Sequence, residues 1–119
     1  YTVNTLTQRS EQMNYTKEQV AEIVAEAQQA AYAAADKFFK EQLGGRDQYA
    51  CGFAWVEVYG VKGNTKLGRI LKELNFRQAM WNPAKYPVQN VDTLEAGARA
   101  AAEVLKGYGF TAYANSRLD

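Results

Sequence analysis

Apolar side chains recur at helical spacing between residues 15 and 43 and mark one face of a helix. This stripe consists of Val20, Ile23, Val24, Ala27, Ala31, Ala34 and Phe38. Thr16 and Gln19 have the spacing of a reciprocal capping box, and Gly44 can adopt the left-handed conformation that follows a last helical turn. The pattern therefore predicts a long amphipathic helix that starts after Thr16 and ends before Gly44.

A run of aromatic and β-branched residues from 51 to 59 predicts a strand, because these residue types suit a pleated, half-buried surface. One face of the strand carries the small side chains of Gly52, Ala54, Val56 and Val58. The other face carries the larger side chains of Phe53, Trp55, Glu57 and Tyr59. Since both faces are mostly apolar, we expect this strand to be central in its sheet and covered on each side.

Two more helices are predicted from the same spacing rule. The first has its apolar stripe at Leu67, Ile70, Leu71 and Leu74, and the second at Leu94, Ala98, Ala101 and Leu105. Thr65 or Asn64 is expected to cap the first of them. Asp92 and Glu95 repeat the capping-box spacing at the start of the second, which is expected to end at Gly107.

Further strands are expected at residues 76–81 and 110–115. After the last strand, Arg117, Asp119 and the terminal carboxylate are expected to lie close together, and a frayed, solvated tail is the alternative. Pro83 and Pro87 cannot donate backbone hydrogen bonds, so a loop follows the earlier of these strands. We therefore expect a single α+β domain over residues 15–119, with a small three-stranded sheet covered by three helices in the order α-β-α-β-α-β. Residues 1–14 are expected to form an N-terminal extension or a mobile tail.

Charge and composition limit the classes of function that the chain can have. The 119 residues include 14 basic and 13 acidic side chains, and the formal charge of +1 lacks the positive excess of non-specific nucleic-acid binders. There is no histidine, and Cys51 is the only cysteine. The chain therefore has neither the commonest general base nor the usual nitrogen and sulfur ligands of transition metals. We expect no metal, no cofactor and no enzymatic activity.

The setting expected from the sequence is a reducing cell interior. A single cysteine excludes an intramolecular disulfide, which favours the cytoplasm. No apolar stretch approaches the roughly 20 residues needed to cross a bilayer, and no signal peptide is recognisable. We therefore expect a soluble, cytoplasmic protein without a membrane partner.

Four short segments stand out: ACGFAWV at residues 50–56, WNP at 81–83, DTLEAGA at 92–98 and AYANSRLD at 112–119. Together they resemble a group of small bacteriophage-encoded proteins without an assigned function, and the likeness spans residues 50–119. The resemblance brings no catalytic residue. It implies an accessory role in the host-cell cytoplasm, because small phage proteins often act stoichiometrically on host factors, including defence systems.

Positive charge is concentrated around the predicted helix near residue 70, where Glu73 is the single acid. A glycine-containing loop that leads into a helix start, with lysines beside it, can hold an anion through backbone N–H groups and the helix dipole. The loop does not match the nucleotide-binding loop motif. A solvated basic face is the alternative explanation. The predicted anion or partner site consists of Lys62, Gly63, Lys66, Arg69 and Arg77.

The loop after the second predicted strand is another candidate surface, since long loops without regular structure are often functional. Its candidate contact residues are Trp81, Asn82, Lys85, Tyr86 and Asn90. Tyr86, between two prolines, is the one most suited to an exposed contact. Proline rigidity alone is the alternative explanation for this loop.

These observations favour a non-enzymatic accessory protein that binds a macromolecule, a host or phage protein before any other. The first alternative is a phosphate or nucleic-acid binding module that uses the basic segment 62–77. The second is an enzyme that works with carboxylates alone, for which Glu57 is the one notable acid. A homo-oligomer is also expected, because the first predicted helix carries alanine on several faces and alanine permits close helix packing.

Overall fold

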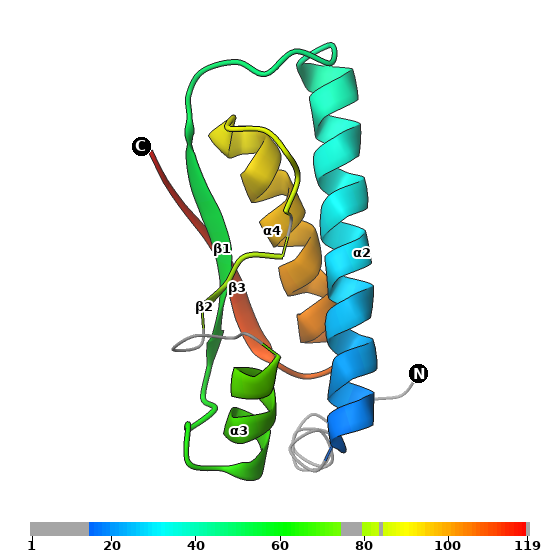
Figure 1. Cartoon of the computed structure of the whole chain (residues 1–119), viewed down its shortest axis with the longest axis vertical. Coiled ribbons are helices and arrows are strands. Elements are labelled where there is room, and N and C mark those ends of the chain that lie inside the picture. Colours follow the sequence, from blue (N-terminus) through cyan, green and yellow to red (C-terminus); the bar gives the residue numbers. More distant parts are fainter. Residues whose placement is uncertain (1–14, 75–79, 84, 119) are drawn as a thin grey trace.

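The structure is a computed structural model that describes residues 15–74, 80–83 and 85–118. Its elements are, in order, α2 (Lys17–Gln42), β1 (Gly52–Tyr59), α3 (Lys66–Glu73), β2 (Met80–Trp81), α4 (Val91–Gly107) and β3 (Thr111–Leu118), as labelled in Figure 1. The predicted α+β class is confirmed. The extension predicted for residues 1–14 lies outside the described residues.

The long helix α2 begins and ends where the sequence predicted. The Thr16 hydroxyl accepts the backbone N–H of Gln19 at 3.1 Å, and the Gln19 side chain accepts the backbone N–H of Thr16 at 2.8 Å. Gly44, with φ of 63°, takes the left-handed conformation after the last turn. Local hydrogen bonding therefore determines both ends of this helix. Its buried face carries Val20, Ile23, Val24, Ala27, Ala31 and Ala35.

One antiparallel ladder dominates the sheet. It joins β1 to β3 and runs from the pair Gly52–Leu118 to the pair Tyr59–Thr111. β2 adds only two residues at the other edge of β1, which gives the order β2-β1-β3. The predicted small three-stranded sheet is therefore not borne out, because the long ladder joins β1 and β3 only and β2 contributes two residue pairs. Pro83, which cannot donate to a ladder, follows β2 closely, and residues 76–79 of the predicted strand lie outside the described residues.

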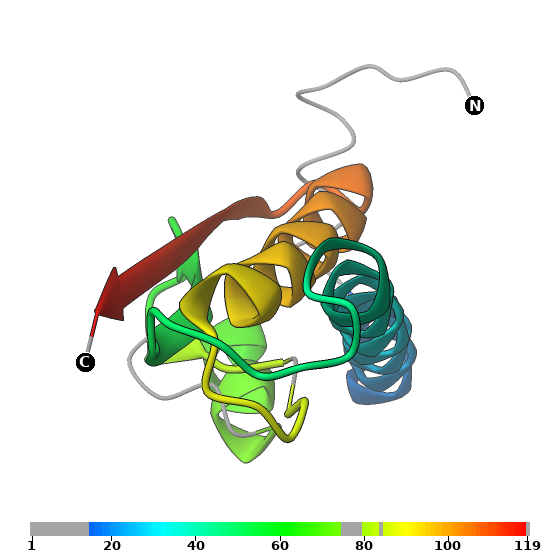
Figure 2. The ribbon, with the colours of Figure 1, turned by 90° about the horizontal axis from the view of Figure 1, so that it is seen from above.

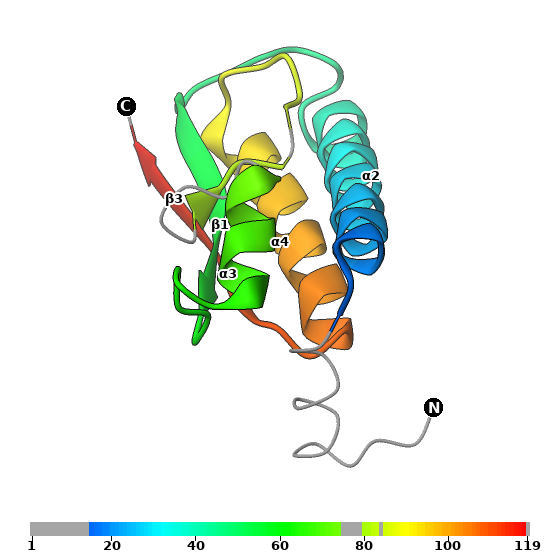
Figure 3. The ribbon, with the colours of Figure 1, turned by 60° about the horizontal axis from the view of Figure 1, so that its bottom comes forward.

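The described helices α2, α3 and α4 all lie on one side of the sheet. α4 packs on the β1–β3 ladder and α2 packs on α4, so that sheet, α4 and α2 form successive layers (Figures 1 and 2). α3 lies beside the N-terminal half of α2 (Figure 3), and an ion pair of 2.9 Å between Lys17 and Glu73 joins these two helices. No described helix or strand covers the opposite side of the sheet.

Small side chains let α4 approach the sheet closely. The helix-facing residues of β1 are Gly52, Ala54, Val56 and Val58, all of them buried. A Cβ atom at position 52 would lie 2.3 Å from the carbonyl oxygen of Arg117 and 2.9 Å from a methyl group of Val91. Only glycine therefore fits where β1 passes the start of α4. Half of the buried residues of α4 are also glycine or alanine, namely Gly97, Ala98, Ala101 and Ala102.

The second face of β1 is open to solvent, so the prediction that both faces would be covered is wrong. Phe53 and Tyr59 are each 49% exposed, and Trp55 and Glu57 are half-buried. On β3 the same face carries Tyr113, which is 51% exposed. Of the described helices, α4 packs on the small-residue face and none covers the other face, so the sheet is an antiparallel sheet with one solvated face.

The helix α4 is capped by Asn90, and not by Asp92 as its spacing to Glu95 predicted. Asn90 is 1% exposed, and its side-chain oxygen accepts the backbone N–H of Thr93 at 2.8 Å and the Thr93 hydroxyl at 2.9 Å. Its amide nitrogen donates to the carbonyl oxygens of Gln48 and Tyr49 at 3.1 and 3.2 Å. Asn90 takes the cap position because it also satisfies two carbonyl groups of the segment before β1.

The last strand is longer than predicted. β3 continues to Leu118, and the pairs Ala54–Ser116, Phe53–Arg117 and Gly52–Leu118 extend its ladder with β1. A frayed tail, the alternative considered for residues 115–119, is therefore excluded as far as Leu118. Backbone pairing with β1 holds these polar residues in the strand. The hydrophobicity of the side chains gives no indication of such pairing, so the strand end could not be predicted from it.

Replacing Asn90 with alanine is expected to destabilise the fold by about 2–4 kcal/mol. The substitution removes a helix cap. It also leaves the buried Thr93 hydroxyl without its acceptor and the Gln48 and Tyr49 carbonyl oxygens without their donor. Urea denaturation followed by circular dichroism measures the effect. Asn82→Ala, at an exposed position in the preceding segment, is the matched control and should change stability by less than about 0.5 kcal/mol. Equally small effects of both substitutions would contradict the role assigned to Asn90.

Candidate functional site

Side chains alternate along a strand, so β1 and β3 each send every second residue to the solvated side of the sheet. We call this surface the open face. It consists of Phe53, Trp55, Glu57 and Tyr59 from β1 and Thr111, Tyr113, Asn115 and Arg117 from β3. The two rows are held side by side by the ladder, in which Phe53 pairs with Arg117 and Glu57 pairs with Tyr113. Aromatic rings, a carboxylate and a guanidinium group therefore share one rigid surface.

Glu57 lies between the aromatic side chains of its own strand. Its carboxylate accepts the indole N–H of Trp55 at 2.9 Å and the hydroxyl of Tyr59. The three residues are two positions apart along β1, so the pleat of the strand aligns them on one face. The polar centre of the open face is therefore built by local strand geometry.

These hydrogen bonds stabilise the ionised carboxylate. The Tyr59 hydroxyl, followed by the Trp55 indole, lowers the pKa of Glu57, and the same contact with Glu57 raises the pKa of Tyr59. Glu57 is therefore a charged hydrogen-bond acceptor at neutral pH, whereas a general acid needs a pKa near the working pH. A carboxylate-only reaction would also need a second acid at the site, and the eight residues of the open face include none.

Cations lie over two of the rings. The Arg117 guanidinium carbon is 5.7 Å from the ring centroid of Phe53, and the Lys106 ammonium is 5.3 Å from that of Tyr113. The rings of Tyr59 and Tyr113 are themselves 5.7 Å apart and tilted by 57°. Tyr59 and Tyr113 thus form an aromatic pair with Lys106 beside it, and Phe53 lies under Arg117 on the same face.

The predicted anion site is spread along an exposed loop and helix. Lys62, Gly63, Lys66 and Arg69 are all exposed, and Arg77 lies outside the described residues. The Arg69 guanidinium donates to the Asn64 carbonyl oxygen at 3.0 Å and so supports the loop. These residues belong to the loop and helix of α3, on the helix side of the sheet, and contribute nothing to the open face.

The start of α3 is capped from within the chain. The Thr65 hydroxyl accepts the backbone N–H of Gly68 at 3.1 Å and donates to the Lys62 carbonyl oxygen at 2.6 Å. A Cβ atom at position 68 would lie 2.1 Å from that same oxygen, so glycine lets the loop fold over the first turn. Gly60 has a positive φ of 78°, whereas Gly63 does not take the left-handed conformation. The anion site stays a prediction that rests on exposed basic side chains.

The partner loop predicted after β2 is largely built into the fold. Trp81 is 5% exposed and belongs to the hydrophobic core, and Asn90 is the buried cap of α4. Of the five candidates only Asn82 and Lys85 are exposed. The hydrophobic core and the cap of α4 therefore account for the presence of Trp81 and Asn90.

Tyr86 is half-buried, so its interpretation as the best exposed contact is wrong. Its hydroxyl donates to the Asp36 carboxylate at 2.5 Å. Its ring packs edge-on against Tyr32 and Phe39 of α2, with centroids 5.0 and 5.7 Å apart. The hydrogen bond to Asp36 raises the pKa of Tyr86 to about 12, and that same bond lowers the pKa of Asp36. Tyr86 thus fastens the loop to α2.

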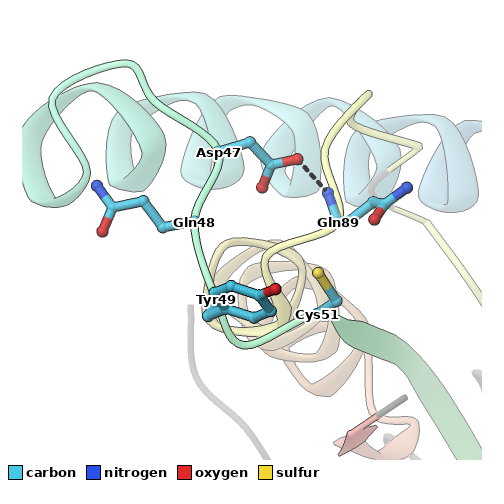
Figure 4. A pocket seen from close by; sticks show the side chains of 5 residues that line it. All are labelled: Asp47, Gln48, Tyr49, Cys51 and Gln89. Atoms are coloured by element: carbon cyan, nitrogen blue, oxygen red, sulfur yellow. Dashed lines mark hydrogen bonds between the residues drawn. The ribbon is translucent and has the colours of Figure 1, made fainter.

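A shallow hollow of about 260 Å³ lies where the segment before β1 meets the segment before α4 (Figure 4). It is lined by Asp47, Gln48, Tyr49, Cys51 and Gln89. The Asp47 carboxylate accepts the backbone N–H groups of Gln89 at 2.9 Å and Asn90 at 3.0 Å, so it joins the two segments. Cys51 is half-buried here, and the chain has no histidine to activate it. The hollow therefore marks the contact between the segment before β1 and the segment before α4.

The described residues include neither a group of potential metal ligands nor a helix that could span a membrane. Across residues 15–74, 80–83 and 85–118, no three side chains of the types His, Cys, Asp and Glu come together as potential metal ligands. In this part of the chain, every helix also lacks either the length or the apolar character to span a bilayer.

Comparisons with protein-family models, with curated proteins and with solved structures found no match to this chain. The site must therefore be interpreted from its own geometry.

Sequence reasoning did not identify the open face as a surface. The pattern of large residues at odd positions of β1 was visible, and so was the alternation of Thr111, Tyr113, Asn115 and Arg117. The available signal was charge, because Glu57 and Arg117 fall on the same face as the aromatic residues and an uncompensated charge is costly to bury.

Replacing Tyr59 with phenylalanine is expected to raise the pKa of Glu57 towards its ordinary value, because the substitution removes the hydroxyl that stabilises the ionised carboxylate. The Trp55 indole N–H bonds the same carboxylate, so its NMR chemical shift against pH reports the titration. Tyr113→Phe, on the neighbouring strand, is the control and should leave the midpoint in place. An unchanged midpoint in the Tyr59 variant would refute this account.

The stability contributed by the bond from Tyr86 to Asp36 is expected to depend on pH at both extremes. The raised pKa of Tyr86 favours the folded protein below about pH 10, and this contribution is lost as the pH rises towards about 12. The lowered pKa of Asp36 favours the folded protein above its ordinary value, and this contribution is lost as the pH falls through the lowered pKa.

Urea unfolding of the natural chain and of Tyr86→Phe tests this expectation. The natural chain should be more stable at neutral pH, and the difference should shrink between pH 10 and pH 12. Tyr32→Phe, which leaves the bond to Asp36 in place, is the control. A difference that stays constant up to pH 12 would show that the hydroxyl bond does not carry the effect.

Proposed function

We propose that the protein is a non-enzymatic binding module that holds a protein partner on the open face of its sheet. The observation that carries this proposal is the grouping of Phe53, Tyr59 and Tyr113, each about half exposed, with Arg117 on one solvated surface. Aromatic residues and arginine are enriched at the energetically important centres of protein interfaces. A partner that covers these rings would remove apolar surface from water, at roughly 25 cal/mol per Å².

The open face is also organised before binding. Its side chains project from a continuous antiparallel ladder, and Trp55, Glu57 and Tyr59 hold one another by hydrogen bonds. Side chains that are already fixed lose little conformational entropy when a partner binds. This supports docking of a folded surface, with small structural change on this side of the complex.

Charge defines what the partner should offer. Glu57 is ionised among the rings, while Arg117 and Lys106 lie at the margin. A complementary surface would present apolar side chains around a hydrogen-bond donor or cation that meets Glu57, with acidic groups at its rim. The resemblance to small phage proteins supports a host protein as this partner, with a defence factor as one candidate, and the host cytoplasm as the place of action.

Single-stranded nucleic acid is a second candidate, because exposed rings on an antiparallel sheet can stack on bases. The ionised Glu57 between the rings opposes a phosphate backbone, and among the described residues only Lys106 and Arg117 lie over these rings. A protein partner is therefore better supported than single-stranded nucleic acid. The basic loop before α3 would have to act elsewhere on the molecule.

The combined variant F53A/Y59A/Y113A is expected to abolish partner binding while the fold is retained, because all three rings lie on the solvated face. The test is affinity purification from host lysate, treated with nuclease, using the natural chain and the variant. A protein that is retained by the natural chain and lost with the variant, at unchanged circular dichroism, supports the proposal. With the purified partner, the dissociation constant is expected to rise at least tenfold.

The matched control is K62A/K66A, which removes two exposed cations from the loop before α3. Partner binding that survives the ring substitutions but is lost in K62A/K66A would reject the open face in favour of the basic segment. Binding of a single-stranded oligonucleotide that weakens steeply with salt would instead favour the nucleic-acid reading.

A further inference from the structure

In the part of the chain that the structure describes, β3 forms an edge of the sheet that no further strand covers. The strand order β2-β1-β3 places it at the outside, and its ladder with β1 is continuous over eight residues without a bulge. The sequence TAYANSRL contains no proline and no lysine, which are common devices that prevent edge pairing. Its outward backbone groups are therefore placed to pair with another strand.

A hollow of about 280 Å³ runs beside this edge, between β3 and α4. Its lining is Arg99, Ala102, Glu103 and Lys106 from α4 and Tyr113 and Ala114 from β3. A strand added to β3 would place its alternate side chains over this hollow. The edge therefore offers backbone hydrogen bonds together with a groove that small or apolar side chains can fill.

Charges alternate along the side of α4 that overlooks the groove. The sequence of signs is negative, positive, negative, positive, at Glu95, Arg99, Glu103 and Lys106. Within the chain, Glu95 contacts Arg99 at 2.7 Å and Glu103 contacts Lys106 at 4.0 Å. We call these four residues the α4 charge row.

The α4 charge row is complementary to itself when it is reversed. An antiparallel copy of α4 brings Glu95 opposite the partner's Lys106 and Arg99 opposite the partner's Glu103. The same two contacts then repeat by symmetry, so all four positions meet the opposite sign. A parallel copy would instead bring like charges together at every position. A two-fold axis is the symmetry that produces the antiparallel arrangement.

The edge of β3 and the α4 charge row can be related to a second copy by the same two-fold axis. Ser116 donates to Glu95 at 2.5 Å, and Lys106 lies over the ring of Tyr113. The middle of the α4 charge row therefore lies above the middle of β3, near Ala114 and Asn115. One two-fold axis can consequently relate two copies of β3 and two copies of the charge row at once.

We propose that the chain forms a two-fold symmetric homodimer in which β3 pairs antiparallel with β3 of a second copy. The pairing is centred on Asn115, which sets Tyr113 opposite the partner's Arg117 and Ala112 opposite the partner's Leu118. Leu118, at 66% exposure, then gains an apolar neighbour, and Arg117 gains a second aromatic ring. This surface differs from the alanine-rich faces of α2 on which the sequence-based expectation of an oligomer rested.

The charge row allows a test by mixing. R99E places a negative charge opposite the partner's Glu103, and E103R places a positive charge opposite the partner's Arg99. Each variant alone should raise the dimer dissociation constant by about tenfold or more. An equal mixture of the two should form the R99E/E103R heterodimer, in which both contacts are again of opposite sign. K37E, on exposed α2 surface, is the control for a charge change of the same size and should dimerise normally.

Light scattering and native mass spectrometry of the full chain supply the measurement. The natural chain should show twice the mass of the 13.3 kDa chain at high micromolar concentration. Loss of the dimer in each variant and its recovery in the mixture support the proposal. A natural chain that remains monomeric, or variants that dimerise like the natural chain, would overturn it.

Disulfide trapping tests the register. In a C51A background, N115C should form an intermolecular disulfide on mild oxidation, because residues related by the axis lie directly opposite each other at about 4.5–5.5 Å between Cα atoms. S116C, one residue further along, is the control and should remain unlinked. Linking of S116C without N115C would overturn the proposed pairing. These variants leave the three rings of the open face intact, so failure of dimerisation and failure of partner binding are distinguishable.

Discussion

The close approach of α4 to the small-residue face of β1 is the contact on which the architecture depends. Gly52 leaves no room for a side chain between β1 and the start of α4, and Ala54 continues the shallow surface. Because α4 occupies this face, α2 packs on α4 and not on the sheet. The larger residues of β1 are thereby left on the side that no described helix covers. Placement of the helices, and not any property of the rings themselves, exposes the open face.

Elements whose ends are fixed by neighbouring residues were predictable from the sequence. The capping box of Thr16 and Gln19 and the cap at Thr65 are contacts three residues apart, so their spacing is readable. The cap of α4 was not predictable in the same way. Asn90 outcompetes Asp92 because it also bonds Gln48 and Tyr49, which are more than forty positions away in the chain. A spacing rule has no access to such a contact.

In the candidate site too, features that depend on neighbouring residues were predictable and features that depend on distant contacts were not. The alternation of β1 gave the correct composition of both faces, but it could not say which face would be covered, because coverage depends on where α2 and α4 pack. Tyr86 was misjudged because its partner Asp36 lies fifty positions earlier, on α2. The basic residues before and within α3 were conspicuous because charge is a local property. Conspicuous charge does not by itself make a site, and Lys62, Lys66 and Arg69 all lie exposed on a loop and helix.

β3 has two different surfaces that do not compete with each other. Its odd residues contribute to the open face, whereas its outer backbone lies in the plane of the sheet. A partner on the open face approaches perpendicular to the sheet, and a second strand at the edge approaches within its plane. Pairing of two copies would therefore extend the open face across the axis without covering it. Two connected open faces raise the effective concentration of the second contact once the first has formed. A symmetric or repetitive partner would then be held much more tightly than one copy of the open face could hold it, and a monomeric target would not gain in this way.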